Sequence, residues 1–104
     1  MLTYKHALTL AETWVRVCCG DGVQIIADKV TKKPYGWIFF YQSSEFIASG
    51  DHRNALAGNA PIIVDRVDGE VRVTGTAKPL SDYLAKYEAT LPKARLEMSL
   101  PSEP

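Results

Sequence analysis

The sequence of 104 residues lacks net charge, because twelve lysines and arginines balance twelve aspartates and glutamates. No overall field therefore draws the chain toward nucleic acid or anionic lipid. It also lacks a long hydrophobic run: the longest strongly apolar stretch is residues 37–41, far below the roughly 20 residues of a membrane-spanning helix. The first six residues show no signal-peptide pattern. We expect a cytoplasmic protein that binds neither nucleic acid nor membrane.

Cysteine is scarce, since only Cys18 and Cys19 are present and they are adjacent. Neighbouring cysteines cannot link separated segments, so we expect two free thiols in a reducing compartment. Cys18 falls on the apolar stripe of the first predicted helix and is expected in the core, where it could not act as a nucleophile. A metal site would need His6 or His52 to join the cysteines, and the spacing matches no structural zinc pattern. We expect neither a metal nor a cofactor.

Catalytic motifs are also missing: there is no Gly-rich phosphate loop, no His-Glu-x-x-His and no nucleophile elbow. His52 lies between Asp51 and Arg53 and could be drawn as a general base oriented by a carboxylate. Three solvated charges at a loop tip are the simpler interpretation. We therefore expect no enzymatic activity and no small-molecule substrate.

Hydrophobic periodicity predicts a helix near each end of the chain. The first spans residues 4–18, with Thr3 as its N-cap and Gly20 as its stop. Its apolar stripe comprises Ala7, Leu10, Ala11, Trp14, Val17 and Cys18. The last helix begins at Pro79 and ends before Pro92. Its apolar stripe comprises Leu80, Tyr83, Leu84, Tyr87 and Leu91.

Two segments between the helices predict strands. Residues 23–30 are β-branched and partly alternating, whereas residues 35–42 give the strongest strand pattern. In the second, Trp37, Phe39 and Tyr41 fall on one face and two apolar residues on the other, which indicates a central strand covered on both sides. A stacking surface for single-stranded nucleic acid is the alternative, formed by Tyr35 and Trp37 with the nearby Lys29, Lys32 and Lys33. A solvated turn explains the lysines as well.

Residues 43–59 form a long polar connection. Loops of this length are uncommon in compact domains, so this one either carries a site or contains a short element. Residues 46–48 are apolar and fit a strand or a helical turn, and the sequence does not decide between them.

A hairpin is predicted for residues 60–67 and 70–76 around the two-residue turn Asp68-Gly69. In this register Val64 faces Val73 on the buried side, and Asp65 pairs with Arg72 on the solvent side. Gly58 to Pro61 form a turn that feeds the hairpin, with Asn59 tolerating a left-handed conformation. Gly75 lets the second strand leave the sheet.

The order of these elements predicts an α+β fold, an antiparallel sheet of about four or five strands flanked by an N-terminal and a C-terminal helix. We expect a single domain over residues 1–92. Residues 93–104 are rich in proline and are expected to form a mobile tail.

Taken as an ordered set, several motifs resemble those of the immunity protein 35 family, also called YrhB-like. They are Tyr35-Gly36-Trp37-Ile38-Phe39-Phe40-Tyr41, Gly58-Asn59-Ala60-Pro61-Ile62-Ile63-Val64-Asp65, Asp68-Gly69, Gly75-Thr76-Ala77, Pro79-Leu80, Tyr83 and Tyr87. The resemblance implies a small cytoplasmic bacterial protein, encoded beside a polymorphic toxin, that binds and neutralises that toxin. Some relatives look instead like small chaperones that bind unfolded clients. The motif residues are expected to be structural: Trp37, Phe39, Gly58, Asn59, Pro61 and Gly75.

The partner-binding surface is expected in variable charged loops, where wrong partners meet repulsion. Two groups of residues fit this description. The long connection supplies Glu45, Asp51, His52, Arg53 and Asn54, and the outward face of the hairpin supplies Asp65, Glu70 and Arg72. A chaperone would instead need an exposed apolar patch.

Overall fold

A computed structural model describes residues 1–56 and 58–102 and has the α+β architecture predicted from the sequence. The elements are α1 (Tyr4–Cys19), β1 (Val23–Ile25), η1 (Ala27–Lys29), β2 (Thr31–Lys33), β3 (Gly36–Phe39), β4 (Tyr41–Ser43), α2 (Ser44–Ser49), η2 (His52–Asn54), β5 (Ile62–Asp65), β6 (Val71–Val73), α3 (Leu80–Glu88) and α4 (Lys93–Leu96). The strands form an antiparallel four-stranded sheet in the order β2-β3-β5-β6 and a two-stranded sheet of β1 and β4. No helix in the described ranges is long and apolar enough to cross a membrane.

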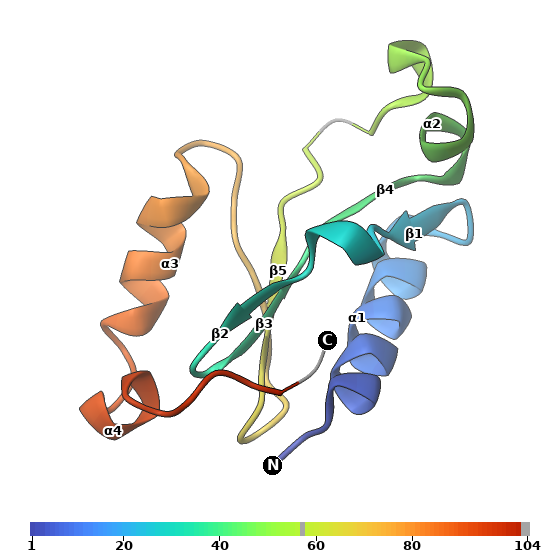
Figure 1. The fold of residues 1–104 in the computed structure, drawn as a ribbon. Helices are drawn as coiled ribbons and strands as arrows, with labels where there is room; N and C mark the ends of the chain where they lie inside the picture. Colours follow the sequence, from blue (N-terminus) through green and yellow to red (C-terminus); the bar gives the residue numbers. More distant parts are fainter. Residues whose placement is uncertain (57, 103–104) are drawn as a thin grey trace.

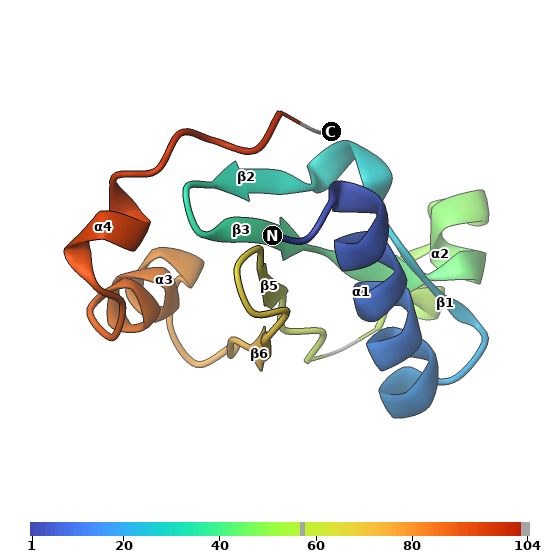
Figure 2. The ribbon, with the colours of Figure 1, turned by 90° about the horizontal axis from the view of Figure 1, so that it is seen from below.

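The larger sheet separates two helical layers. Helix α1 lies on one side and α3 on the other, as Figure 1 and the turned view in Figure 2 show. Each side has its own apolar cluster, one under α1 and one under α3. Strand β3 contributes to both, because Trp37 and Phe39 face α1 whereas Ile38 faces α3. The prediction of a central strand covered on both sides is confirmed.

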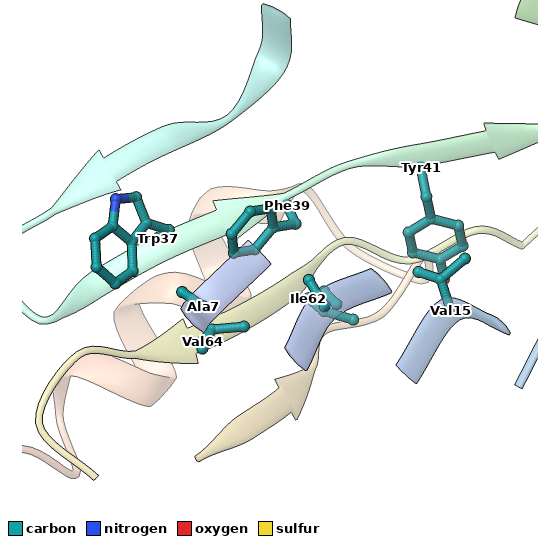
Figure 3. Close-up of a cluster of buried hydrophobic side chains, with 8 residues drawn as sticks. Ala7, Val15, Trp37, Phe39, Tyr41, Ile62 and Val64 are labelled. Atoms are coloured by element: carbon teal, nitrogen blue, oxygen red, sulfur yellow. The ribbon is translucent and has the colours of Figure 1, made fainter. Parts of the chain in front are cut away.

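The cluster under α1 is built on small residues of the helix. Ala7, Ala11 and Val15 are buried against Trp37, Phe39, Tyr41, Ile62 and Val64 of the strands (Figure 3). Alanine has a short side chain, so the helix can lie close to the sheet. The predicted stripe is confirmed in part: Ala7, Ala11 and Trp14 face the core. Leu10, Val17 and Cys18 are exposed, so placing Cys18 in the core was wrong. On α1, the partly buried Tyr4, Leu8 and Trp14 also pack against this cluster.

The caps of α1 agree with the sequence. Thr3 Oγ1 accepts a hydrogen bond from the His6 amide at 3.3 Å, and Gly20 ends the helix with φ 91°. A positive φ in this range favours glycine, which has no Cβ.

Both predicted strands are interrupted, because the chain passes between the two sheets. Residues 23–30 divide into β1 and the 3-10 turn η1, and β2 follows only at Thr31. In the same way residues 35–42 divide at Phe40, whose carbonyl accepts the Ile26 amide at 2.8 Å. One extended segment thus serves both sheets, with β3 in the larger and β4 in the smaller.

The predicted register of the β5–β6 hairpin was wrong. Val64 pairs with Val71, not Val73, and Arg72 stands opposite Ile63. The loop is longer than two residues because Asp65 folds over it: its Oδ1 accepts the Val67 amide at 2.8 Å, and its carbonyl accepts the Gly69 amide at 3.0 Å. Asp65 therefore forms no pair with Arg72, and its side chain is fully buried.

Helix α4 packs on the same side as α3, and the chain after it runs past β2 toward α1 (Figure 2), where Pro101 lines a hollow with Tyr4 and Trp37. Helix α3 buries Leu84 and Tyr87 and ends at Glu88, earlier than predicted. Beyond it, Arg95 of α4 forms an ion pair with the buried carboxylate of Asp65, and the Ser99 carbonyl accepts a hydrogen bond from Arg66. Mobility of this tail stays a prediction.

Candidate functional site

The long connection after β4 forms a charged tip, built from α2 and η2. The hydroxyl of Ser43 caps α2 by accepting the Phe46 amide at 3.0 Å, and Gly50 ends the helix in a left-handed conformation with φ 69°. Asp51 then caps η2 by accepting the Arg53 amide at 3.0 Å. The apolar residues 46–48 thus belong to a helix, the second of the two options that the sequence left open.

The tip brings together the first group of predicted binding residues, Glu45, Asp51, His52, Arg53 and Asn54. Both oxygens of Asp51 accept hydrogen bonds from the Arg53 guanidinium, with Nη2 to Oδ2 at 2.7 Å. This pairing lowers the pKa of Asp51, and it leaves the Arg53 side chain 90% exposed. The tip therefore presents a fixed carboxylate and a guanidinium to solvent, with Glu45 exposed in the first turn of α2.

The second predicted group is divided by the structure. Glu70 and Arg72 form an ion pair at the surface, whereas Asp65 is buried and faces away from solvent. Figure 1 places α2 beyond one end of the sheet and the β5–β6 turn at the other, near the N-terminus. The carbonyl of Arg66 in that turn accepts the Leu2 amide at 2.6 Å. The two groups thus do not form one site.

The catalytic alternative at His52 finds no supporting geometry. The carboxylate of Asp51 is engaged by Arg53, and the His52 ring packs on Phe46 with centroids 5.6 Å apart. A base needs an acceptor that orients its ring, and Asp51 does not serve as one. Partial burial and the neighbouring Cys18 raise the pKa of the Cys19 thiol, which favours the unreactive protonated form.

The nucleic-acid and metal alternatives also lack a built site. Tyr35 and Trp37, which would have to stack on bases, are each only 1% exposed. Within residues 1–56 and 58–102, no three His, Cys, Asp or Glu side chains gather closely enough to hold a metal ion.

The motif residues of the family resemblance lie in the core or in turns. Trp37 and Phe39 are buried under α1, and Gly58 adopts a left-handed conformation with φ 71°. Asn59 does not take the left-handed conformation expected of it; its side-chain Nδ2 donates to the Tyr41 carbonyl at 2.9 Å instead. The Pro61 carbonyl accepts the Thr74 amide at 3.0 Å.

Gly75 meets Tyr83 of α3, because a Cβ at this glycine would come within 2.6 Å of the Tyr83 ring. Because Gly75 has no side chain, the loop after β6 can pass directly against Tyr83 of α3.

Sequence reasoning missed a buried polar network on the α3 side of the sheet. Asp65 Oδ2 accepts a hydrogen bond from the Tyr87 hydroxyl at 3.0 Å and pairs with Arg95. Nearby, the Tyr35 hydroxyl donates to Glu88 at 2.8 Å, and the rings of Tyr35 and Tyr87 meet edge to face at 5.4 Å. The resemblance pointed at Asp65 and Tyr87 but not at their contact.

Comparison with known proteins decides the family. The model of the family described as immunity protein 35 matches residues 5–89. The chain belongs to this family. Among curated proteins it is 51% identical over 88 residues to the uncharacterized protein YrhB of Escherichia coli strain K12, covering 85% of this chain and 90% of that protein. No solved structure matches. The immunity protein 35 family suggests a role in immunity to a toxin, and a partner toxin in general.

Proposed function

We propose that this member of the immunity protein 35 family is a cytoplasmic, non-catalytic antagonist of a bacterial polymorphic toxin. It binds the toxin domain in a stoichiometric protein–protein complex and so blocks its action. The observation that carries this proposal is the family match across residues 5–89, which includes every strand in the described ranges, all of α3 and all of α1 but its first residue. We expect the partner to be encoded by an adjacent gene.

The binding residues proposed first are those of the charged tip. A specific complex needs about 800 Å² on each partner and a few well-packed anchors. The ion pair of Asp51 and Arg53, with Glu45, His52 and Asn54 around it, offers charges that discriminate between related toxins. Glu70 and Arg72 at the hairpin surface are proposed as a second, separate contact. Buried Asp65 is left out.

The proposal is tested by calorimetric titration of the chain with the C-terminal toxin domain encoded by the neighbouring upstream gene. We expect one-to-one binding at nanomolar or tighter affinity, about −12 kcal/mol. Co-expression should protect cells from the same toxin domain. Absence of both binding and protection would contradict the proposal.

Substitution of the tip tests the surface separately. Arg53→Ala should weaken toxin binding about tenfold or more, because an exposed guanidinium is removed from the contact. The melting temperature should stay unchanged, since the exposed pair with Asp51 contributes little to folding. Arg16→Ala, at an exposed arginine of α1, is the matched control. Unchanged affinity for alanine variants across the whole tip would remove it from the site.

A chaperone function is the second candidate, favoured by apolar side chains at the surface near the N-terminus. Leu2 and Leu10 line an open hollow of about 420 Å³ beside Gly69, and Met1 is exposed. A chaperone would suppress aggregation of several unrelated heated proteins with little selectivity. Such activity without toxin binding would favour this function over the first.

A further inference from the structure

Strand β6 is an open edge of the four-stranded sheet (Figure 2). The amides of Thr74 and Asp65 donate to the carbonyls of Pro61 and Glu70, so these are the hydrogen-bonded pairs of the β5–β6 ladder. Pairs alternate along an antiparallel ladder. The backbone N–H and C=O groups of Val71 and Val73 therefore point away from β5. They offer an incoming strand a ready set of hydrogen bonds.

A groove runs beside this edge, between β6 and α3. Its volume is about 290 Å³, and its lining includes Arg72, Tyr83, Lys86 and Thr90. Both charged side chains in the lining are cations. The Arg72 guanidinium lies over the ring of Tyr87 at 5.6 Å and pairs with Glu70, whereas Lys86 forms no ion pair within the described residues.

The charges argue against a second copy of this chain as the occupant. If two β6 strands paired so that Val71 met Val73 of the other copy, Arg72 would stand directly opposite Arg72. Like charges at opposed positions destabilise a sheet. The same geometry favours a strand with an acidic residue opposite Arg72, because that side chain would project over the groove toward Lys86.

We propose that the β6 edge and the groove beside α3 bind an extended, acidic segment of a partner protein, which adds to the sheet as a further strand. Its backbone pairs with Val71 and Val73, and a carboxylate enters the groove between Arg72 and Lys86. This inference rests on the proposed function in that the toxin domain is the natural source of the segment.

Two variants test the proposal in titrations with the toxin domain of the neighbouring gene. Lys86→Glu reverses an exposed charge in the groove and should weaken binding about tenfold or more. Val73→Pro removes an amide that the β5 ladder does not use, so the fold should persist while the added strand loses a hydrogen bond. Lys5→Glu on α1, across the sheet from the groove, should bind normally. Circular dichroism and the melting temperature of each variant establish that it folds.

A second arm does not depend on the toxin. Random twelve-residue peptides displayed on phage are selected on the wild-type chain and then measured on both variants. We expect selected peptides to carry Asp or Glu within β-prone sequence, and to bind Lys86→Glu at least tenfold more weakly.

The outcomes separate the two proposals. If the toxin domain binds the wild-type and both variants equally, the groove proposal is overturned and the antagonist function stands. A toxin domain that does not bind at all contradicts the function, and the peptide selection then decides the groove alone. The groove proposal would be overturned by selection of no peptide, of peptides without acidic residues, or of peptides that bind both variants as tightly as the wild-type.

Discussion

At the scale of single residues, Asp65 shows how a carboxylate is held inside this fold. Its two oxygens have separate partners: Oδ1 accepts the Val67 amide of the hairpin loop, and Oδ2 accepts Tyr87 and Arg95. A buried charge is costly unless it is paired and hydrogen-bonded. Arg95 is thirty residues away in the sequence, so no local pattern could show that Asp65 belongs inside. The prediction that Asp65 lies on the solvent side of the hairpin was wrong for this reason.

The two buried tyrosines lead to a prediction at high pH. Burial, followed by the hydrogen bond to a carboxylate, raises the pKa of Tyr35 beside Glu88 and that of Tyr87 beside Asp65. Unfolded tyrosine ionises near pH 10. Above that pH the unfolded chain releases protons that the folded chain retains, so the stabilisation present below pH 10 is lost as pH rises. The free energy of unfolding should fall by about 1.4 kcal/mol per pH unit for each tyrosine.

Urea unfolding at pH 9, 10 and 11 measures this slope. Tyr35→Phe and Tyr87→Phe should each remove one tyrosine's share of it, since phenylalanine does not ionise. Lysines titrate in the same range but contribute equally to the wild-type and variants. An identical slope in all three proteins would contradict the raised pKa values of Tyr35 and Tyr87.

At the scale of elements, the contact between β3 and β5 depends on Gly36. This residue has φ 154°, and a Cβ built on it would lie 2.1 Å from the Val64 carbonyl oxygen. Backbone cannot move aside as a flexible side chain can. We expect Gly36→Ala to lower the free energy of unfolding by about 3 kcal/mol or more, from strain and overpacking together.

Gly22→Ala is the matched control for this glycine, because nothing lies within 4 Å of a Cβ there and its φ is not positive. Thermal unfolding of both variants makes the comparison. Equal melting temperatures would show that the strands do not approach as closely as described.

Most elements were predictable from local signals, and the errors have physical causes. The Thr3 cap, the Gly20 stop and the two-faced β3 follow from residues close in sequence. The division at Phe40 does not, because both halves favour extended backbone and only tertiary pairing assigns β3 and β4 to different sheets. The turn η1 after Ile26 also interrupts a segment whose residues favour extended backbone. The charged residues of the long connection predicted which side chains lie at the tip. The Asp51–Arg53 pair could not be predicted in this way, because it depends on the turn of η2.

At the scale of the whole molecule, the two proposed surfaces lie on different parts of an elongated domain. Its extents are 43 × 29 × 22 Å, whereas an interface of about 800 Å² is only about 30 Å across. We treat the charged tip and the β6 groove as separate candidate surfaces, because α2 lies beyond one end of the sheet whereas the groove lies between β6 and α3. Comparing Arg53→Ala with Lys86→Glu therefore identifies which surface the toxin domain uses.

The last ten described residues decide where the domain ends. The sequence predicts a mobile tail after residue 92, but Arg95 neutralises buried Asp65, and Pro101 is buried. A chain ending at Pro92 should lose about 3 kcal/mol or more of unfolding free energy, because a carboxylate inside the fold loses its cation. Arg95→Met should lose a similar amount while retaining the tail.

The Asp65→Asn background makes this test specific, because a neutral side chain there needs no cation. The cost of Arg95→Met should shrink in that background, which a double-mutant cycle from urea unfolding measures directly. If the tail moves freely, truncation and Arg95→Met will leave the stability unchanged in both backgrounds. The domain would then end at residue 92, and Asp65 would depend on Tyr87 and the loop amides alone.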